Sequence, residues 1–135
     1  MTGVGGDHAH LDETTPWVRR WLRAEGLTGL AAGYALWAWL GAPPVLFLVF
    51  LLAPDVSMAG YLSGPHVGAI AYNIAHNWAI GGLVLGLGLL LSVPLIALAG
   101  SILVAHTGMD RLAGYGLKYP TSFHDTHLGR IGRLA

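Results

Sequence analysis

Six ionisable or strongly polar side chains lie inside long apolar stretches of this sequence. They are Asp55, Asn73, His76, Asn77, His106 and Asp110. In an apolar helical bundle such groups face the interior and pair with one another or with a ligand. Imidazole and carboxylate together favour a divalent metal ion, of which Zn, Mn and Fe are candidates. The sequence therefore predicts a metal site. Its predicted ligands are Asp55, His76, His106 and Asp110.

Helical spacing places these polar residues on shared faces. Asn73, His76 and Asn77 are spaced i, i+3 and i+4, which puts them on one face of a helix. His106 and Asp110 are spaced i and i+4 and also share a face. A histidine and an aspartate one turn apart can bind one ion from a single helix, as inward histidines and carboxylates do in metal-binding bundles. The spacing therefore agrees with the predicted ligand set.

Helix geometry also predicts that the ligands lie at one depth in a bundle. Across a turn near residue 92, His76 lies about 24 Å from the turn, while His106 and Asp110 lie about 21 and 27 Å from it. Across the preceding turn, Asp55 lies about 13 Å away and His76 about 18 Å away. We therefore expect the four side chains to meet at one level, toward one end of the helices.

Two interpretations fit these polar residues. In the first, the histidines and aspartates bind a metal ion, and Asn73, Asn77 and His127 support those ligands by hydrogen bonding. His124 and Asp125 lie in a polar tail, which could fold over the site and manage protons there; alternatively, the tail rests on a membrane surface with its histidines in water. In the second interpretation of the site, the histidines and aspartates only neutralise one another as a structural network without metal.

The distribution of charge indicates which solvent surrounds these elements. Asp, Glu, Lys and Arg make up only 10% of the 135 residues, against about 25% in a typical soluble domain. None of them occurs in residues 26–54 or 56–109. A soluble domain of this size needs charged residues on its surface. Because these long stretches have none, the sequence predicts an integral membrane protein. The net charge of zero gives no reason to expect nucleic acid as a partner.

The apolar runs predict an all-α fold, an integral membrane bundle of about four transmembrane helices with a polar C-terminal tail. Long runs without alternation favour helices, because lipid requires every backbone group to be satisfied within the segment. The predicted helices span about residues 25–40, 45–62, 66–91 and 95–112, separated by turns that contain proline or glycine. Pro54-Asp55 lies either inside the second helix or at a break in it. The predicted organisation is a disordered tail over 1–16, the transmembrane domain over 17–113 and a cytoplasmic tail over 114–135.

Basic residues predict the orientation. They lie before the first predicted helix, and at the end of the last one or after it, while the turns near residues 41–44 and 92–94 carry no charge. Because basic residues stay on the cytoplasmic side, four crossings place both termini in the cytoplasm. The expected location is the cell (inner) membrane, with the lipid bilayer as the surrounding partner.

Several motifs resemble a family of small bacterial membrane proteins known only as a domain of unknown function. They are APDVSMAGY (53–61), YNIAH (72–76), AHTGMDR (105–111), GYGLKYP (114–120) and DTHLG (125–129). The resemblance covers about residues 22–131. It implies a membrane location and no established activity.

A second resemblance is to predicted membrane-bound metal-dependent hydrolases. Their order of motifs recurs here as Pro54-Asp55, His76-Asn77 and His106-x-x-x-Asp110, although Asn77 stands where a serine is usual and the chain is short. The resemblance implies the same metal constellation and a hydrolase, but it implies no substrate. The predicted depth of the site, toward the cytoplasmic end of the helices, suggests a phospholipid or another phosphate ester at the cytoplasmic interface as the substrate. The alternative function is a non-enzymatic membrane protein that binds, senses or transports a metal ion or a proton.

Overall fold

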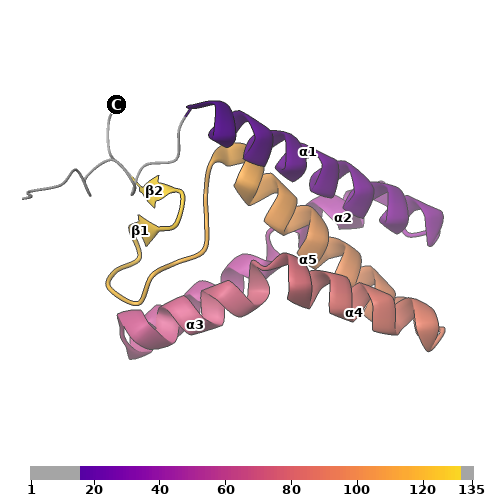
Figure 1. The fold of residues 1–135 in the computed structure, drawn as a ribbon. Coiled ribbons are helices and arrows are strands. Elements are labelled where there is room, and N and C mark those ends of the chain that lie inside the picture. The colour runs from indigo at the N-terminus through magenta and orange to yellow at the C-terminus, as the bar shows by residue number, and fades with distance from the viewer. Residues whose placement is uncertain (1–15, 132–135) are drawn as a thin grey trace, which may run out of the picture.

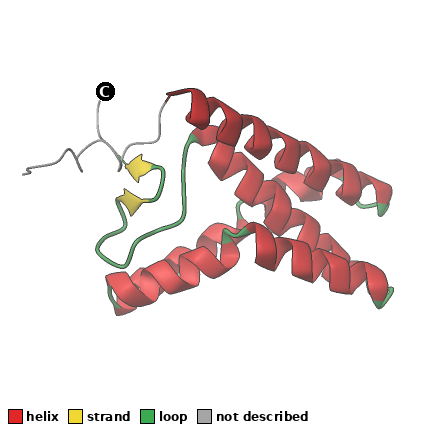
Figure 2. Ribbon diagram, in the orientation of Figure 1, coloured by secondary structure: helices red, strands yellow, loops and turns green. Residues whose placement is uncertain are grey.

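The computed structural model describes residues 16–131, and helices dominate that part of the chain (Figure 2). In chain order the elements are α1 (Pro16–Trp39), α2 (Pro44–Leu51), the 3-10 helix η2 (Ala53–Ser63), α3 (Pro65–Ala75), α4 (Trp78–Leu90), α5 (Pro94–Ala113), β1 (Asp125–Thr126) and β2 (Gly129–Arg130). The prediction of an all-α fold is confirmed. The predicted disordered tail over 1–16 lies outside the described residues except for Pro16, as do the last four residues of the predicted C-terminal tail.

Proline and glycine set the helix boundaries. Pro44, Pro65 and Pro94 each open a helix, where the fixed φ angle suits the first turn and the missing N–H leaves no helical bond unmade. Gly41 and Gly64 precede two of these starts with φ angles of 80° and 106°, a conformation that glycine adopts without strain. The predicted turns therefore lie where these residues occur.

The second predicted helix is not continuous. α2 ends at Leu51, and residues 53–63 continue as a 3-10 helix. Pro54 has no N–H to continue the α-helical ladder, and the Asp55 N–H bonds the Leu52 carbonyl at 3.1 Å. An α-helix would have paired the Asp55 N–H with the Leu51 carbonyl instead. The break therefore leaves the Leu51 carbonyl available to another donor.

The third predicted helix is also broken, so the prediction of a single helix over 66–91 is wrong. α3 and α4 meet at an angle of 45°, and the two residues between them are His76 and Asn77. Asn77 has an extended backbone, and its side chain accepts hydrogen bonds from the N–H groups of Ala79 (2.7 Å) and Ile80 (3.3 Å). Asparagine competes with helix continuation in this way and starts a new helix as its N-cap.

Helix α5 lies between α1 and α4 and packs along both, while α3 packs on η2 (Figure 1). Glycine permits the close approach of α1 and α5. A Cβ atom added to Gly26 would lie 2.5 Å from the Leu112 nitrogen and 2.6 Å from the Gly108 carbonyl oxygen. A small apolar core of Trp37, Phe47, Ile102 and Ala105 joins α1, α2 and α5. Such contacts through small residues are how helices pack in lipid.

Two helical segments of the described chain, Pro44–Ser63 and Pro94–Ala113, are long and apolar enough to cross a membrane. The bent pair α3 and α4 makes a third if it forms one span. The predicted bundle of four transmembrane helices is therefore not confirmed. α1 starts earlier than predicted and includes Arg19, Arg20 and Arg23. It is therefore less apolar than the two segments that are long and apolar enough to cross a membrane.

Candidate metal centre

Asp55, His76, His106 and Asp110, hereafter the Asp/His cluster, converge where η2, the α3–α4 break and α5 meet. The Nε2 atoms of His76 and His106 lie 2.9 Å apart. Each of them lies 3.2 Å from the same oxygen, Oδ1 of Asp55. These three residues form a group of donor atoms that could hold a metal ion.

Asp110 lies beside this group at a slightly longer distance. Its Oδ1 atom is 3.6 Å from His106 Nε2, and its Oδ2 atom is 3.7 Å from His76 Nε2. The Tyr72 hydroxyl donates a hydrogen bond of 2.7 Å to Oδ2 of Asp110. Tyr72 therefore fixes the Asp110 carboxylate against the two imidazoles.

The backbone determines the proton positions on both imidazole rings. His76 Nδ1 lies 2.7 Å from the Tyr72 carbonyl oxygen, and His106 Nδ1 lies against the Leu51 carbonyl oxygen that the α2–η2 break leaves available. A carbonyl oxygen can only accept, so each Nδ1 carries the proton. In the neutral rings each Nε2 then has a lone pair, and both lone pairs face Asp55. This is the arrangement in which histidine binds metal, with the other ring nitrogen oriented by a carbonyl.

The separations of the donor atoms fit a divalent ion. An ion about 2.1 Å from its ligands holds neighbouring ligands about 3.4 Å apart in a tetrahedron and about 3.0 Å apart in an octahedron. The three separations in the cluster are 2.9, 3.2 and 3.2 Å, close to these values. Two imidazole nitrogens and carboxylate oxygens suit Zn, Mn or Fe.

The cluster is enclosed on most sides. His76 and His106 are fully buried, whereas the Asp55 side chain keeps 36% of its surface exposed. The Tyr72 ring stacks on the His76 ring with 3.7 Å between centroids. Arg111 donates from Nη2 to the His76 carbonyl at 3.2 Å and from Nη1 to the Tyr115 carbonyl at 2.8 Å. The histidines are thus held rigidly, and access is on the Asp55 side.

A pocket of about 310 Å³ adjoins the cluster, and we refer to it as the cluster pocket. Among the residues that line it are Asp55, Tyr72, Asp110, Tyr115, Lys118 and Phe123. Both aspartates of the cluster face this space, and residues of the C-terminal tail form part of its wall. Ligand, water and a reacting group could therefore meet there.

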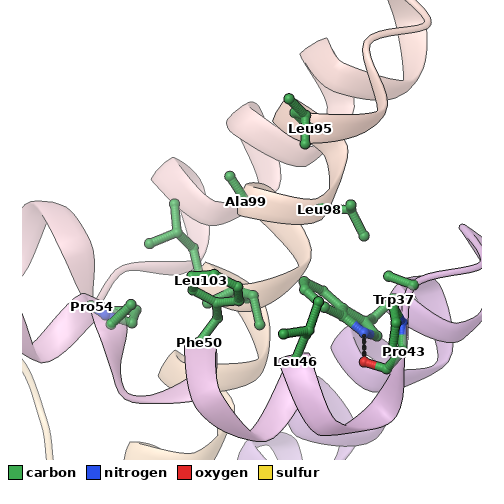
Figure 3. Close-up of a pocket in the computed structure, with 12 residues that line it drawn as sticks. Trp37, Pro43, Leu46, Phe50, Pro54, Leu95, Leu98, Ala99 and Leu103 are labelled. Atoms are coloured by element: carbon green, nitrogen blue, oxygen red, sulfur yellow. Dashed lines mark hydrogen bonds between the residues drawn. The ribbon is translucent and has the colours of Figure 1, made fainter.

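A larger cavity lies elsewhere and has a different character. This apolar groove of about 600 Å³ is lined by residues from α1, α2 and α5 that include Trp37, Leu46, Phe50, Leu98 and Ala99 (Figure 3). None of the four cluster residues lines it. Acyl chains would fill an apolar groove of this kind in a bilayer, so the cluster pocket is the better candidate for chemistry.

The residues predicted to support the ligands have other hydrogen-bond partners. Asn73 accepts from the Lys118 N–H at 2.7 Å and donates to the Lys118 carbonyl at 2.8 Å. Asn77 caps α4. His127 accepts at Nδ1 from the Leu117 N–H at 2.8 Å, and burial lowers the pKa of its imidazole. Asn73 and His127 therefore hydrogen-bond the backbone of the tail rather than the metal ligands.

The two residues predicted to manage protons bond within the tail. Oδ2 of Asp125 accepts a hydrogen bond of 2.6 Å from the Thr121 hydroxyl, which lowers the pKa of the Asp125 carboxyl. His124 packs its ring against Phe123. Neither residue hydrogen-bonds the cluster in the described part of the chain, so the structure does not bring them to it.

Three residues near the cluster were not predicted from the sequence: Tyr72, Arg111 and Lys118. Tyr72 precedes His76 by four residues, so helical spacing alone places it on the same face. Arg111 follows Asp110 directly. Lys118 is the only lysine in the chain. Its contact with Asn73 joins residues far apart in sequence, so no local sequence pattern predicts that Lys118 lies near the cluster.

Comparison with known proteins identifies the family. Residues 19–131 match DUF4260, described as a domain of unknown function. No curated protein and no solved structure matches the chain. Because the match covers most of the sequence and includes every residue of the Asp/His cluster, the protein belongs to the DUF4260 family.

Proposed function

We propose that the protein is a membrane-bound metal-dependent hydrolase. The observation that carries the proposal is the convergence of two Nε2 atoms and one Asp55 oxygen at separations of 2.9–3.2 Å, while the Nδ1 atom of each ring lies against a backbone carbonyl. Such a group is stable when a cation lies among its members. The order of the motifs, which resembles that of predicted membrane-bound metal-dependent hydrolases, supports the same proposal.

Each residue of the cluster has a role in this proposal. Asp55, His76 and His106 hold the ion, and Asp110 completes the donor set with Oδ2 fixed by the Tyr72 hydroxyl. A bound divalent ion lowers the pKa of a coordinated water to about 7 and polarises a phosphoryl or carbonyl oxygen. The cluster pocket holds the substrate, which we propose to be a lipid or another phosphate ester at the cytoplasmic interface.

We also propose that the protein is integral to the cell membrane with both termini in the cytoplasm. The basic residues in the first turns of α1, and those in the last turn of α5 and after it, support this orientation. An even number of crossings is required, so α1 would cross the bilayer together with Pro44–Ser63, the bent pair α3 and α4, and α5.

One observation favours a second candidate, a non-enzymatic protein that binds, senses or transports a metal ion or a proton. The gap of 2.9 Å between the two Nε2 atoms is also the length of a hydrogen bond. A single proton shared by His76 and His106, balanced by Asp55, would fill it. In that case the cluster would exchange a proton without hydrolysis.

Metal analysis of the full-length protein purified in detergent tests the proposal. We expect one divalent ion per chain in the wild type, and loss of that ion from His106→Ala and Asp110→Ala while the protein stays folded. His124→Ala is the matched control, because it removes a tail histidine that does not bond the cluster. Release of phosphate from phosphate esters should require the ion. A wild type that binds none of Zn, Mn or Fe would exclude the hydrolase.

A further inference from the structure

We propose that Lys118 binds the anionic group of the substrate and that this group is a phosphoryl group. The inference rests on the proposed function and names the substrate class and the residue that selects it. It comes from a different part of the molecule, since Lys118 lies in the tail after α5 and is not a metal ligand.

The first step is the position of the Lys118 side chain. The residue is only 4% exposed, yet it lines the cluster pocket together with Asp55 and Asp110. Its Nζ atom lies 3.8 Å from the centroid of the Phe123 ring and 4.9 Å from that of Tyr72. The two rings hold a cation through their faces and direct it to the same space as the carboxylates.

The second step is that the ammonium has donors to offer. Within residues 16–131, Nζ of Lys118 makes no hydrogen bond and no ion pair within 4.0 Å. An ammonium has three donors, and a buried charge without a partner is unfavourable. Burial lowers the pKa of Lys118, and the nearby Asp110 opposes that effect. An anion in the cluster pocket would satisfy these donors.

The third step is that the lysine is positioned by its backbone. Asn73 binds both the N–H and the carbonyl of Lys118, and Thr126 pairs with Lys118 from the other side through a β-bridge. A surface lysine has no such support. The side chain is therefore placed at the pocket rather than left to sample solvent.

The fourth step is the balance of charge. A divalent ion offsets the two carboxylates of the cluster, after which Lys118 and Arg111 add two positive charges. The Arg111 guanidinium bonds two backbone carbonyls, so Lys118 is the cation that lines the pocket. A phosphate monoester carries about −1.5 to −2 charges at neutral pH, whereas a carboxylate carries one. The charge favours a phosphoryl group.

Binding of inorganic phosphate to the metal-loaded protein in detergent tests the inference by calorimetry. Loss of a charged hydrogen-bond donor in Lys118→Met should weaken phosphate binding by about 10- to 100-fold. Lys118→Arg keeps the charge and should bind within a few-fold of wild type. Arg130→Gln removes a positive charge from the same tail at an exposed residue that does not line the pocket, and should leave phosphate binding unchanged.

The outcomes separate this inference from the proposed function. Metal content is measured in every variant and should not change. Unchanged phosphate affinity in metal-loaded Lys118→Met would overturn the role of Lys118 and leave the metal site standing. An equal loss in Arg130→Gln would also overturn it, because the effect would then be general charge. A wild type without metal would overturn the proposed function itself.

A further arm distinguishes a lipid headgroup from a free phosphate ester. Phosphatidate in mixed micelles and glycerol phosphate in solution are compared, in wild type and in Ala99→Phe, which narrows the apolar groove. If wild type binds phosphatidate more tightly than glycerol phosphate, and Ala99→Phe weakens the binding of phosphatidate but not of glycerol phosphate, the phosphoryl group belongs to a lipid. Equal binding of both, unaffected by the variant, would assign it to a soluble ester. Failure of both to bind would overturn the inference.

Discussion

Replacing Asp55 with asparagine should change stability in opposite directions in the presence and absence of metal. Without metal, Oδ1 of Asp55 and the two Nε2 lone pairs repel one another at separations of 2.9–3.2 Å. Asparagine has nearly the same shape, but its amide can donate to an imidazole nitrogen. Asp55→Asn should therefore stabilise the metal-free protein and remove the stabilisation that metal provides.

The expected magnitudes follow from these contacts. One new neutral hydrogen bond contributes about 0.5–1.5 kcal/mol to the free energy of unfolding. We count only one such bond, because the side chain at position 55 is 36% exposed and its other polar atom can bond water. For a chain of this size that corresponds to a Tm rise of about 2–6 °C. In the wild type, metal at 100 times its Kd should stabilise by about 2.7 kcal/mol, and in the variant by much less.

Thermal unfolding of chelator-stripped protein in detergent, with and without added Zn²⁺, measures both effects. A lower Tm for metal-free Asp55→Asn would refute the reasoning, because it would mean that Asp55 neutralises a protonated histidine in a structural network. The loss would then be about 1.5–3 kcal/mol, as for a bond to a charged group. An unchanged response to Zn²⁺ in the variant would show that Asp55 is not a ligand.

Truncation after Lys118 should impair phosphate-ester hydrolysis while metal content stays constant, because the tail forms one wall of the cluster pocket; full activity of the truncated protein would contradict that role. Reporter fusions at Ser92 and Ala135 should report opposite sides of the membrane, and the same side for both would exclude four crossings. The depressed pKa of His127 means that the folded state resists its protonation, so this residue should reduce stability as the pH falls below the unfolded value of about 6.5. Hydrogen exchange at Leu117, corrected for intrinsic rate, should speed up between pH 7 and pH 5 in wild type but not in His127→Gln.

The depth of the cluster was predictable, because rise per residue depends only on helical geometry. His76 and His106 belong to different helices, yet the count from the turn near residue 92 placed them at one level, and their Nε2 atoms lie 2.9 Å apart. The α3–α4 break did not alter this result, because it lies at His76 itself rather than between His76 and the turn near residue 92. The height of Asp55 was counted with the α-helical rise, whereas residues 53–63 form a 3-10 helix, which rises about 2.0 Å per residue. Whether a metal ion binds there stays a prediction.

The break at His76-Asn77 and the tail were harder to predict, whereas the prediction left open a break at Pro54-Asp55. Asn77 lies in an apolar run, where its polarity suggested a supporting role at the site, but its side chain instead competes with the helix backbone and caps α4. The tail depends on contacts between distant residues. Asn73 binds the backbone of Lys118 across 45 positions, and no periodic pattern encodes a contact of that kind.

The Asn73 contact has a consequence for how this site could diverge. Asn73 recognises only the main chain at position 118, through one N–H and one carbonyl, so any residue except proline preserves both bonds. Attachment of the tail is thereby separated from the chemistry of the side chain that the tail presents. Relatives could exchange that side chain, and with it the charge of the molecule they accept, without rebuilding the fold. Position 118 would then be a site where selectivity evolves at little expense to stability.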